Sequence, residues 1–122
     1  MATQPRGVIV VDDDPGFLNS VVRLLSVHGF KARTFNSAEA LLDSDAVMTA
    51  NPMLLDIHLG GISGIELHRR LAASGSNCPV IFMTAIDDDA TRKEAMNAGC
   101  IAYLKKPFAP NLLLDALKKA VA

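Results

Sequence analysis

The sequence has few of the features that mark specialised protein classes. It contains two cysteines in 122 residues, Cys78 and Cys100, and neither belongs to a C-x-x-C pair or lies near a histidine at metal-ligand spacing. Twelve Lys and Arg residues against thirteen Asp and Glu residues leave a formal net charge of −1, and the basic residues are scattered. We therefore expect reduced thiols and no direct binding of nucleic acid. A disulfide would still need only that the two cysteines, which precede neighbouring predicted strands, come close enough.

Long apolar runs are also missing. No run approaches the roughly 18 residues that span a bilayer, and the polar start MATQPRG lacks the apolar core of a signal peptide. There are no internal repeats and no low-complexity segments. Half of the residues are apolar (50%) and a fifth are charged (20%), which is typical of globular proteins. We expect one domain over residues 1–122, located in the cytoplasm and without membrane contact.

Short apolar runs alternate with longer amphipathic stretches. Four runs are almost continuously apolar, as strands buried on both faces must be, and they cover residues 8–11, 53–55, 80–83 and 101–104. Between the first two, KARTF at residues 31–35 alternates polar and apolar side chains and predicts an edge strand. This alternation is typical of a parallel sheet that is covered by helices on both faces.

Helix signals fill the gaps between these strands. Asp14 can cap a first helix, with Pro15 at its first position and Gly29 as a left-handed stop. Its predicted buried stripe consists of Phe17, Val21, Leu24 and Leu25. Ser37 can cap a second helix, which ends at Leu42. A third helix, over residues 64–73, carries Leu67 and Leu71 on one face.

The last two helices differ in their apolar content. The fourth, over residues 88–98, has almost no large apolar stripe, so it is predicted to be the most mobile element. The fifth begins near Pro110 and carries Leu113, Leu114, Leu117 and Val121 at helical spacing. Five strand and helix units in this order predict an α/β, doubly wound, five-stranded parallel sheet with strand order 2-1-3-4-5 and right-handed crossovers.

Polar side chains follow four of the five predicted strands. In such a fold, ligands bind at the carboxyl ends of the strands, near the point where the strand order reverses. The residues at this rim are Asp12, Asp13 and Asp14 after the first strand, Asp56 after the third, Thr84 after the fourth and Lys106 after the fifth.

Three carboxylates are expected to converge at this rim. With Asp14 used as a helix cap, Asp12, Asp13 and Asp56 would lie within about 5 Å, where each pair repels by roughly 3 kcal/mol at an effective dielectric of 20. A hard divalent cation relieves that repulsion, and Mg²⁺ prefers sites with few carboxylates and room for a phosphoryl oxygen. An acidic cluster beside one lysine therefore indicates phosphoryl transfer. Solvated carboxylates that only cap helices are the alternative.

The same segments resemble a known family. VIVVDDDPGF, LLDIHLGGISGIEL, VIFMTA and AGCIAYLKKPF are similar to the signature segments of response regulator receiver domains, in the same order along residues 7–121. The resemblance implies a flavodoxin-like, chemotaxis-regulator-like fold. It also implies a two-component phosphorelay in which a histidine kinase or a histidine phosphotransferase donates the phosphoryl group.

The resemblance assigns roles to the residues at the rim. Asp56 would be the phosphoacceptor, Asp13 a direct Mg²⁺ ligand and Asp12 a ligand through water, with the backbone carbonyl of His58 completing the metal site. Lys106 would pair with Asp56 and then with the phosphoryl group. The family pattern also implies a cis peptide bond between Lys106 and Pro107.

Further implications concern the switch and its readout. Thr84 would bond the phosphoryl group and Tyr103 would turn inward, although a half-buried tyrosine with a wet hydroxyl is the alternative. The fourth helix, fifth strand and fifth helix would form the output surface for an effector domain, an effector protein or a homodimer. The chain would catalyse only its own phosphotransfer and autodephosphorylation, so it would not be an enzyme.

The three histidines and Gly60 have no role in the predicted site chemistry described so far, apart from the backbone carbonyl of His58. His58 either tunes the phosphoryl lifetime or is only solvent-exposed, and His28 and His68 are expected to be solvated. Gly60 stands where many relatives carry proline, which predicts a more flexible loop.

Two other functions compete with the phosphoacceptor. Asp12-Asp13-Asp14 contains the Asp-x-Asp of a haloacid-dehalogenase-like phosphohydrolase, with Asp12 as nucleophile, but this reading leaves Asp56 unexplained and the chain has no room for a cap domain. The other alternative is a receiver that only docks and is never phosphorylated.

Overall fold

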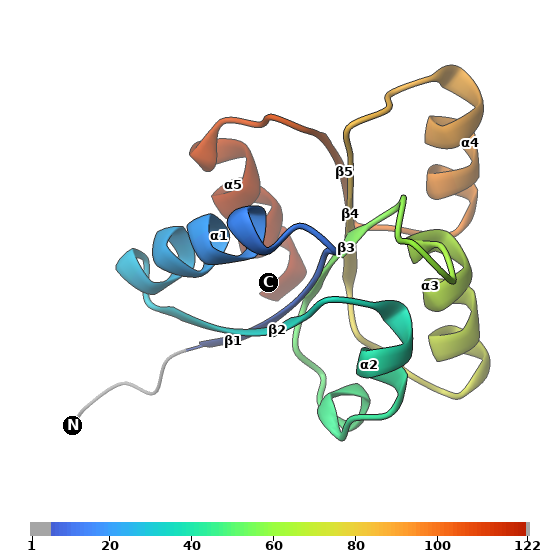
Figure 1. The fold of residues 1–122 in the computed structure, drawn as a ribbon, viewed down its shortest axis with the longest axis horizontal. Helices are drawn as coiled ribbons and strands as arrows, with labels where there is room; N and C mark the ends of the chain where they lie inside the picture. Colours follow the sequence, from blue (N-terminus) through green and yellow to red (C-terminus); the bar gives the residue numbers. More distant parts are fainter. Residues whose placement is uncertain (1–5, 122) are drawn as a thin grey trace.

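The computed structural model describes residues 6–121, which form a five-stranded sheet between two layers of helices (Figure 1). The strands are β1 (Arg6–Val11), β2 (Phe30–Phe35), β3 (Met53–Asp56), β4 (Val80–Thr84) and β5 (Ala102–Lys105). All neighbouring strands are parallel and the order is β2-β1-β3-β4-β5, so the predicted fold class is confirmed. Residues 1–5 and 122 of the predicted domain lie outside the described residues.

Helices cover both faces of the sheet. They are α1 (Pro15–Val27), α2 (Ala38–Leu42), α3 (Gly64–Ala73), α4 (Asp89–Asn97) and α5 (Pro110–Val121). In Figure 1, α1 and α5 lie on one side of the sheet and α2, α3 and α4 on the other. A short 3₁₀ helix, η1 (Ala46–Met48), was not predicted, because one turn leaves no periodicity to detect.

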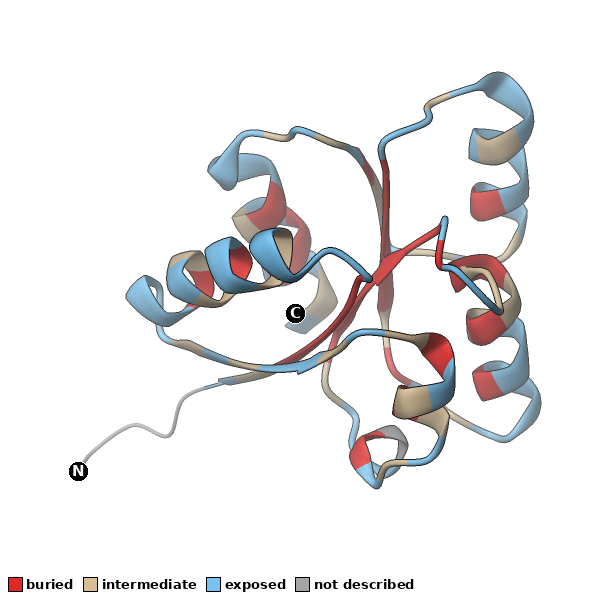
Figure 2. Cartoon of the chain, in the orientation of Figure 1, coloured by how far each residue is buried: buried red, intermediate tan, exposed pale blue. Residues whose placement is uncertain are grey.

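Alternate residues of the central strands supply the two halves of the core. Ile9 and Leu55 pack toward the side of α2 and α3, whereas Val10 and Leu54 pack toward α1 and α5. Figure 2 shows these strands as the buried centre of the molecule. The almost continuous apolar runs in the sequence therefore reflect burial on both faces.

The helix punctuation was predicted correctly. Asp14 Oδ1 accepts hydrogen bonds from the backbone N–H of Gly16 (2.9 Å) and of Phe17 (3.3 Å), which caps α1. Gly29 follows α1 with φ of 84°, the left-handed conformation that glycine adopts without strain. Ser37 caps α2 in the same way as Asp14 caps α1.

Several element limits and faces needed correction. β1 extends back to Arg6 because Arg6 and Gly7 still pair with β2. β5 begins at Ala102 rather than at residue 101, because Ile101 is exposed and the pairing with β4 starts one residue later. Val121, which was predicted to lie on the buried face of α5, is 40% exposed. Ala116, which was not predicted there, is buried on that face beside Leu113 and Leu117.

The strand register sets the positions of the polar residues at the carboxyl ends. Asp56 lies opposite Met83 on β4, and Thr84 lies opposite Lys105 on β5. The functional side chains predicted from the sequence therefore meet at one rim of the sheet. Among the described residues, we find no helix with the length and hydropathy needed to cross a membrane.

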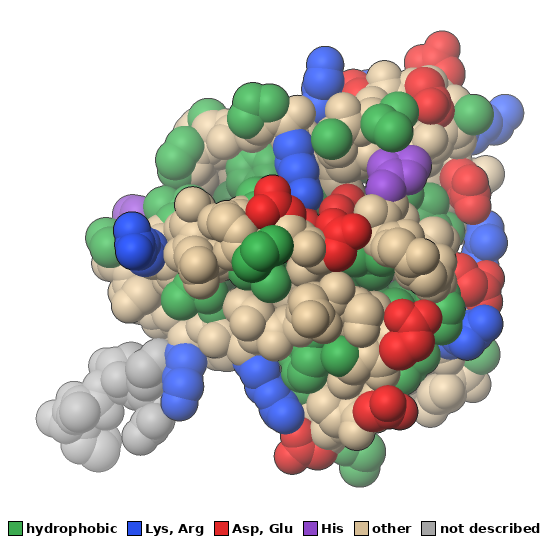
Figure 3. Space-filling model, viewed as in Figure 1, with side chains coloured by type: hydrophobic (Ala, Val, Ile, Leu, Met, Phe, Trp, Pro, Cys, Tyr) green, Lys and Arg blue, Asp and Glu red, His purple; other side chains and the backbone are tan. Residues whose placement is uncertain are grey.

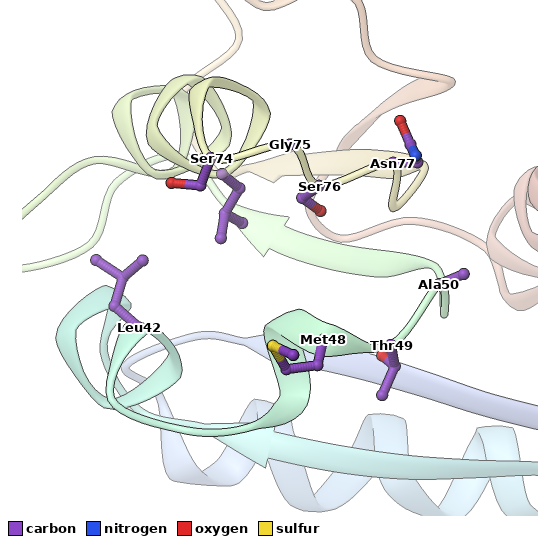
Figure 4. A pocket seen from close by; sticks show the side chains of 9 residues that line it. Leu42, Met48, Thr49, Ala50, Ser74, Gly75, Ser76 and Asn77 are labelled. Carbon is purple, nitrogen blue, oxygen red and sulfur yellow. The ribbon is translucent and has the colours of Figure 1, made fainter.

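A hollow opens at the other rim, beside the amino ends of β3 and β4 (Figure 4). Its volume is about 480 Å³, and its lining comes from α2, η1, the segment before β3 and the turn after α3. The lining includes Leu42, Ser74 and Asn77 and contains no charged side chain. This hollow therefore offers no group for metal or phosphoryl chemistry, and the candidate site lies at the carboxyl rim.

Candidate functional site

Asp12, Asp13, Asp56 and Lys106 meet above the carboxyl ends of β1, β3 and β5, and we call this group the acid pocket. One oxygen from each of the three carboxylates lies within 4.8 Å of the others. Figure 3 shows acidic side chains gathered next to a basic one on this face. The convergence predicted from the strand ends is therefore confirmed.

Asp12 is completely buried, with 0% of its surface exposed. Its Oδ1 accepts a hydrogen bond from the backbone N–H of Asp14 (2.9 Å), and its Oδ2 pairs with Lys106 Nζ. Both oxygens thus already have protein partners. Asp13, by contrast, is exposed at the mouth of the acid pocket, which suits a residue that contacts a cation directly.

Asp56 is 6% exposed and lies at the end of β3. Its Oδ1 accepts from the backbone N–H of His58 (3.2 Å), and its Oδ2 lies 3.5 Å from Lys106 Nζ. Burial raises the pKa of the Asp56 carboxyl, Lys106 opposes that rise, and the neighbouring charges of Asp12 and Asp13 add to it. The burial of Asp56 and its acidic neighbours therefore disfavour the negative charge on its carboxylate, and Lys106 stabilises that charge.

A glycine at the start of α3 allows this arrangement. A Cβ on Gly64 would collide with the backbone carbonyl of Asp56. The loop between them, which carries Gly60, is also held by Glu39 of α2, whose Oε2 accepts a hydrogen bond from Ile62 N–H (3.3 Å). The extra flexibility predicted from Gly60 stays a prediction, but this loop has at least one anchor on α2.

Lys106 is mostly enclosed, with 17% of its side chain exposed. Besides the two carboxylates, its Nζ lies 4.2 Å from the centroid of the Phe17 ring. The peptide bond between Lys106 and Pro107 is cis, as predicted. Phe17 was predicted only as part of the buried stripe of α1, because residue spacing within a helix does not indicate contact with a residue far along the chain.

The donor set fits a hard cation. The three carboxylates offer oxygen atoms, which are the ligands that divalent cations such as Mg²⁺ or Ca²⁺ prefer. Asp12 and Asp56 are buried and Asp13 is exposed, so one side of the site is open to solvent. Among the described residues, no buried side-chain nitrogen or oxygen lacks a hydrogen-bond partner. The exposed carboxylate of Asp13 is therefore the ligand atom of this set that a metal ion could reach from solvent.

Thr84 and Tyr103 lie outside the acid pocket contacts. Thr84 is buried, and its Oγ1 donates to the carbonyl of Ile86 (2.8 Å) and accepts from the N–H of Ile86 (3.0 Å). The Tyr103 hydroxyl donates to Asp87 Oδ1 (3.2 Å), and the Arg92 guanidinium lies 5.4 Å from the ring centroid. Thr84 therefore bonds to the loop that precedes α4, and Tyr103 points toward charged groups.

We call Asp87, Arg92 and Tyr103 the outer cluster. The Arg92 guanidinium binds the Asp87 carboxylate at 2.7 Å, and this bond lowers the pKa of Asp87. The pKa of Tyr103 is raised, first by partial burial of its hydroxyl and second by the hydrogen bond to Asp87. Asp87 and Arg92 were not predicted from the sequence. Their spacing of five residues across the start of a helix resembles any surface pair, so the sequence carried no signal for them.

The histidines and cysteines complete the comparison with the sequence predictions. His28 is exposed, as expected, but the prediction for His68 was wrong. His58 is exposed as well, and its role in tuning the phosphoryl lifetime stays a prediction. His68 Nε2 lies 2.8 Å from the carbonyl of Ala98, because its helix face turns toward the end of α4. Cys78 and Cys100 are free thiols, as expected.

Comparison with known proteins agrees with this geometry. The family model described as response regulator receiver domain matches residues 8–118. The transcriptional regulatory protein TdiR of Thauera aromatica is 35% identical over 115 residues, which cover 94% of this chain and 51% of TdiR. This chain spans about half the length of the curated relatives that it matches.

Solved structures give the same result. The response regulator StyR has a TM-score of 0.87 and 36% identity, with 97% of this chain and 59% of StyR covered. Full-length FixJ from B. japonicum has a TM-score of 0.89 and 32% identity, with 98% of this chain and 59% of FixJ covered. Together with the family match over residues 8–118, these likenesses show that the chain belongs to the response regulator receiver domain family.

Proposed function

We propose that the chain is a phosphorylation switch in which Asp56 accepts a phosphoryl group from a phosphohistidine of a histidine kinase or histidine phosphotransferase. A carboxylate oxygen of Asp56 forms the P–O bond as the P–N bond to the histidine breaks, and the leaving imidazole nitrogen takes up a proton. The observation that carries this proposal is the position of Asp56, buried beside two other carboxylates with Lys106 Nζ at 3.5 Å.

The acid pocket would hold Mg²⁺ through Asp12, Asp13, Asp56 and the backbone carbonyl of His58. When bound, Mg²⁺ would supply positive charge against the oxygens of the transferred phosphoryl group. The exposed position of Asp13 favours direct coordination. Asp12, whose two oxygens already have protein partners, fits coordination through water better than direct coordination.

Lys106 would supply the second positive charge. In the present arrangement its ammonium is shared between Asp12 and Asp56. The phosphorylated carboxyl group of Asp56 no longer carries the charge that attracts Lys106, whereas the phosphoryl oxygens do. The ammonium would therefore stay in place and change its partner from the Asp56 oxygen to a phosphoryl oxygen.

Thr84 and Tyr103 would carry the change outward. The Thr84 hydroxyl now bonds to Ile86 and would have to exchange these bonds for a phosphoryl oxygen. Tyr103 would leave Asp87 and turn into the space that opens. The arrangement described above therefore fits the unphosphorylated state of the switch.

The surface of α4, β5 and α5 would be the output. Ala95 is the buried residue of α4 among those described, which fits a helix that can shift, although its mobility stays a prediction. TdiR and FixJ are named transcriptional regulatory proteins. By analogy, we propose that this surface acts on an effector domain, an effector protein or a second copy, in the cytoplasm, and that the chain transforms no substrate besides itself.

One experiment separates this function from its competitors. The protein is incubated with Mg²⁺ and acetyl phosphate, and the modified residue is located by mass spectrometry after borohydride reduction. We expect modification at Asp56 in the wild type and none in Asp56→Asn. Modification at Asp12 would instead support a phosphohydrolase, although Asp14, the second carboxylate of its motif, caps α1. If no donor modifies the protein, including a phosphorylated histidine phosphotransferase, the result would support a receiver that only docks.

A further inference from the structure

The strongest feature outside the assigned roles is the aromatic side of the acid pocket. Lys106 Nζ lies 4.2 Å from the centroid of the Phe17 ring, within the range in which a cation is attracted by the face of an aromatic ring. Two carboxylates contact the same ammonium from Asp12 and Asp56. The lysine head group is therefore enclosed by two anions and one aromatic ring.

The Phe17 ring is itself held in place. The backbone N–H of Phe17 donates to Asp14 Oδ1, so the residue is fixed to the N-cap of α1, directly after the acidic run. The ring packs edge-on against Phe108, with centroids 6.2 Å apart and planes at 79°. Phe108 follows Pro107, so the contacts of Phe17 reach residues on both sides of that proline.

We propose that Phe17 is a positioning residue for phosphoryl transfer, which keeps the Lys106 ammonium directed at Asp56. A lysine has a long flexible stem and a strongly hydrated head group, so it turns toward water wherever nothing competes. The ring competes in two ways: its face attracts the cation, and its area excludes water from one side of the ammonium. This inference rests on the proposed function, since it concerns the reaction at Asp56.

Phe17→Leu keeps an apolar side chain in α1 and removes the aromatic face. We expect the rate constant for phosphorylation by acetyl phosphate to fall about fivefold, as the loss of a partly desolvated cation–π contact implies. The affinity for Mg²⁺ should stay within about twofold of the wild type, because neither Phe17 nor Lys106 is among the proposed metal ligands. Phe30→Leu is the matched control, since Phe30 packs against the same core cluster but lies at the opposite end of the sheet.

A fluorination series separates the attraction from packing. Replacing Phe17 by mono-, di- and trifluorophenylalanine weakens the negative face of the ring in steps while its size changes little. We expect the phosphorylation rate to fall at each step. A flat series, with a loss only in Phe17→Leu, would mean that the ring acts by packing alone and would overturn the proposal.

An NMR measurement tests the contact without any phosphorylation. The ring current of Phe17 should shift the Cε methylene protons of Lys106 upfield, and Phe17→Leu should return them to the position of ordinary lysines, with Lys106→Met used for assignment. Unshifted protons in the wild type would overturn the proposal. If Asp56 is never modified in the wild type, the proposed function fails, whereas the NMR result still decides whether the ring holds the lysine.

Discussion

The acid pocket and the outer cluster both bring a cation against carboxylates, but they do so in different surroundings. In the acid pocket, the side chains of Lys106 and Asp12 are 17% and 1% exposed. In the outer cluster, the side chains of Arg92 and Asp87 are 54% and 16% exposed. Burial deprives charges of water, so the charges of the acid pocket depend on each other. In the outer cluster, water reaches the half-exposed Arg92 although Asp87 is as enclosed as Lys106, so its ion pair depends less on the protein and is correspondingly weaker.

The largest effect should come from Lys106→Met. Removing the cation leaves the buried carboxylates of Asp12 and Asp56 without their compensating charge, so we expect a loss of about 3 kcal/mol in the free energy of unfolding at pH 7. Urea denaturation measures this loss. The matched control is Lys105→Met, which removes an exposed lysine next to it and should change stability by less than about 0.5 kcal/mol. Equal losses in both variants would contradict the comparison.

Asp56→Asn should have a smaller effect of opposite sign. Because the pKa of Asp56 is raised in the folded state, the folded protein binds this proton more tightly than the unfolded chain. Stability therefore falls as pH rises from the ordinary value of 3.8 through the raised value, and stays lower above it. The neutral asparagine escapes this loss, so we expect a higher free energy of unfolding and a higher Tm than in the wild type at pH 7.

The pH dependence provides the control for Asp56→Asn. The gain should shrink as the pH is lowered through the raised pKa and below 3.8, where the wild-type carboxyl becomes protonated in both states. Asp115→Asn, at an exposed position on α5, is the matched control and should not show the gain. A gain that does not change with pH would mean that shape, and not charge, explains the effect.

Asp87→Ala should leave the free energy of unfolding almost unchanged and should lower the pKa of Tyr103. Tyr103 is the one tyrosine in a chain without tryptophan, so intrinsic fluorescence reports on this side chain. Loss of the carboxylate that accepts its hydroxyl should lower the pKa of Tyr103 toward the ordinary value of 10.0, which ultraviolet titration measures. An unchanged titration would mean that Tyr103 is held by packing alone.

The smallest effect concerns salt. At an ionic strength of about 1 M, charges are screened over roughly 3 Å in solvent, but buried pairs are screened much less. The effect of Asp87→Ala on the Tyr103 titration should therefore shrink in 1 M salt, while the stability loss of Lys106→Met should largely persist. Parallel titrations and denaturation curves at low and high salt test this contrast. A similar response in both regions would show that exposure does not separate them.

The same contrast explains what the sequence could predict. Strand order and the convergence of Asp12, Asp13 and Asp56 followed from apolar runs that end in polar residues, because parallel strands bring their carboxyl ends together. Capping by Asp14 followed from local chemistry. These features depend on position along an element, which the sequence records directly.

Contacts between side chains of different elements were not predictable. The ring of Phe17 below Lys106 and the Tyr103 bond to Asp87 join distant or irregular segments, and their geometry depends on how helices pack on the sheet. His68 was misjudged for the same reason, since helical position alone does not show that α4 ends beside it.

The pairing of β3 with β4 and of β4 with β5 has a consequence for how this chain can vary. Asp56 and Thr84 occupy fixed rungs of the sheet, opposite Met83 and Lys105. Inserting a single residue within β4 would turn every later side chain of that strand to the opposite face, exchanging its two halves of the core. Natural variants should therefore gain and lose residues in the loops at either rim, while the lengths of the three central strands stay constant.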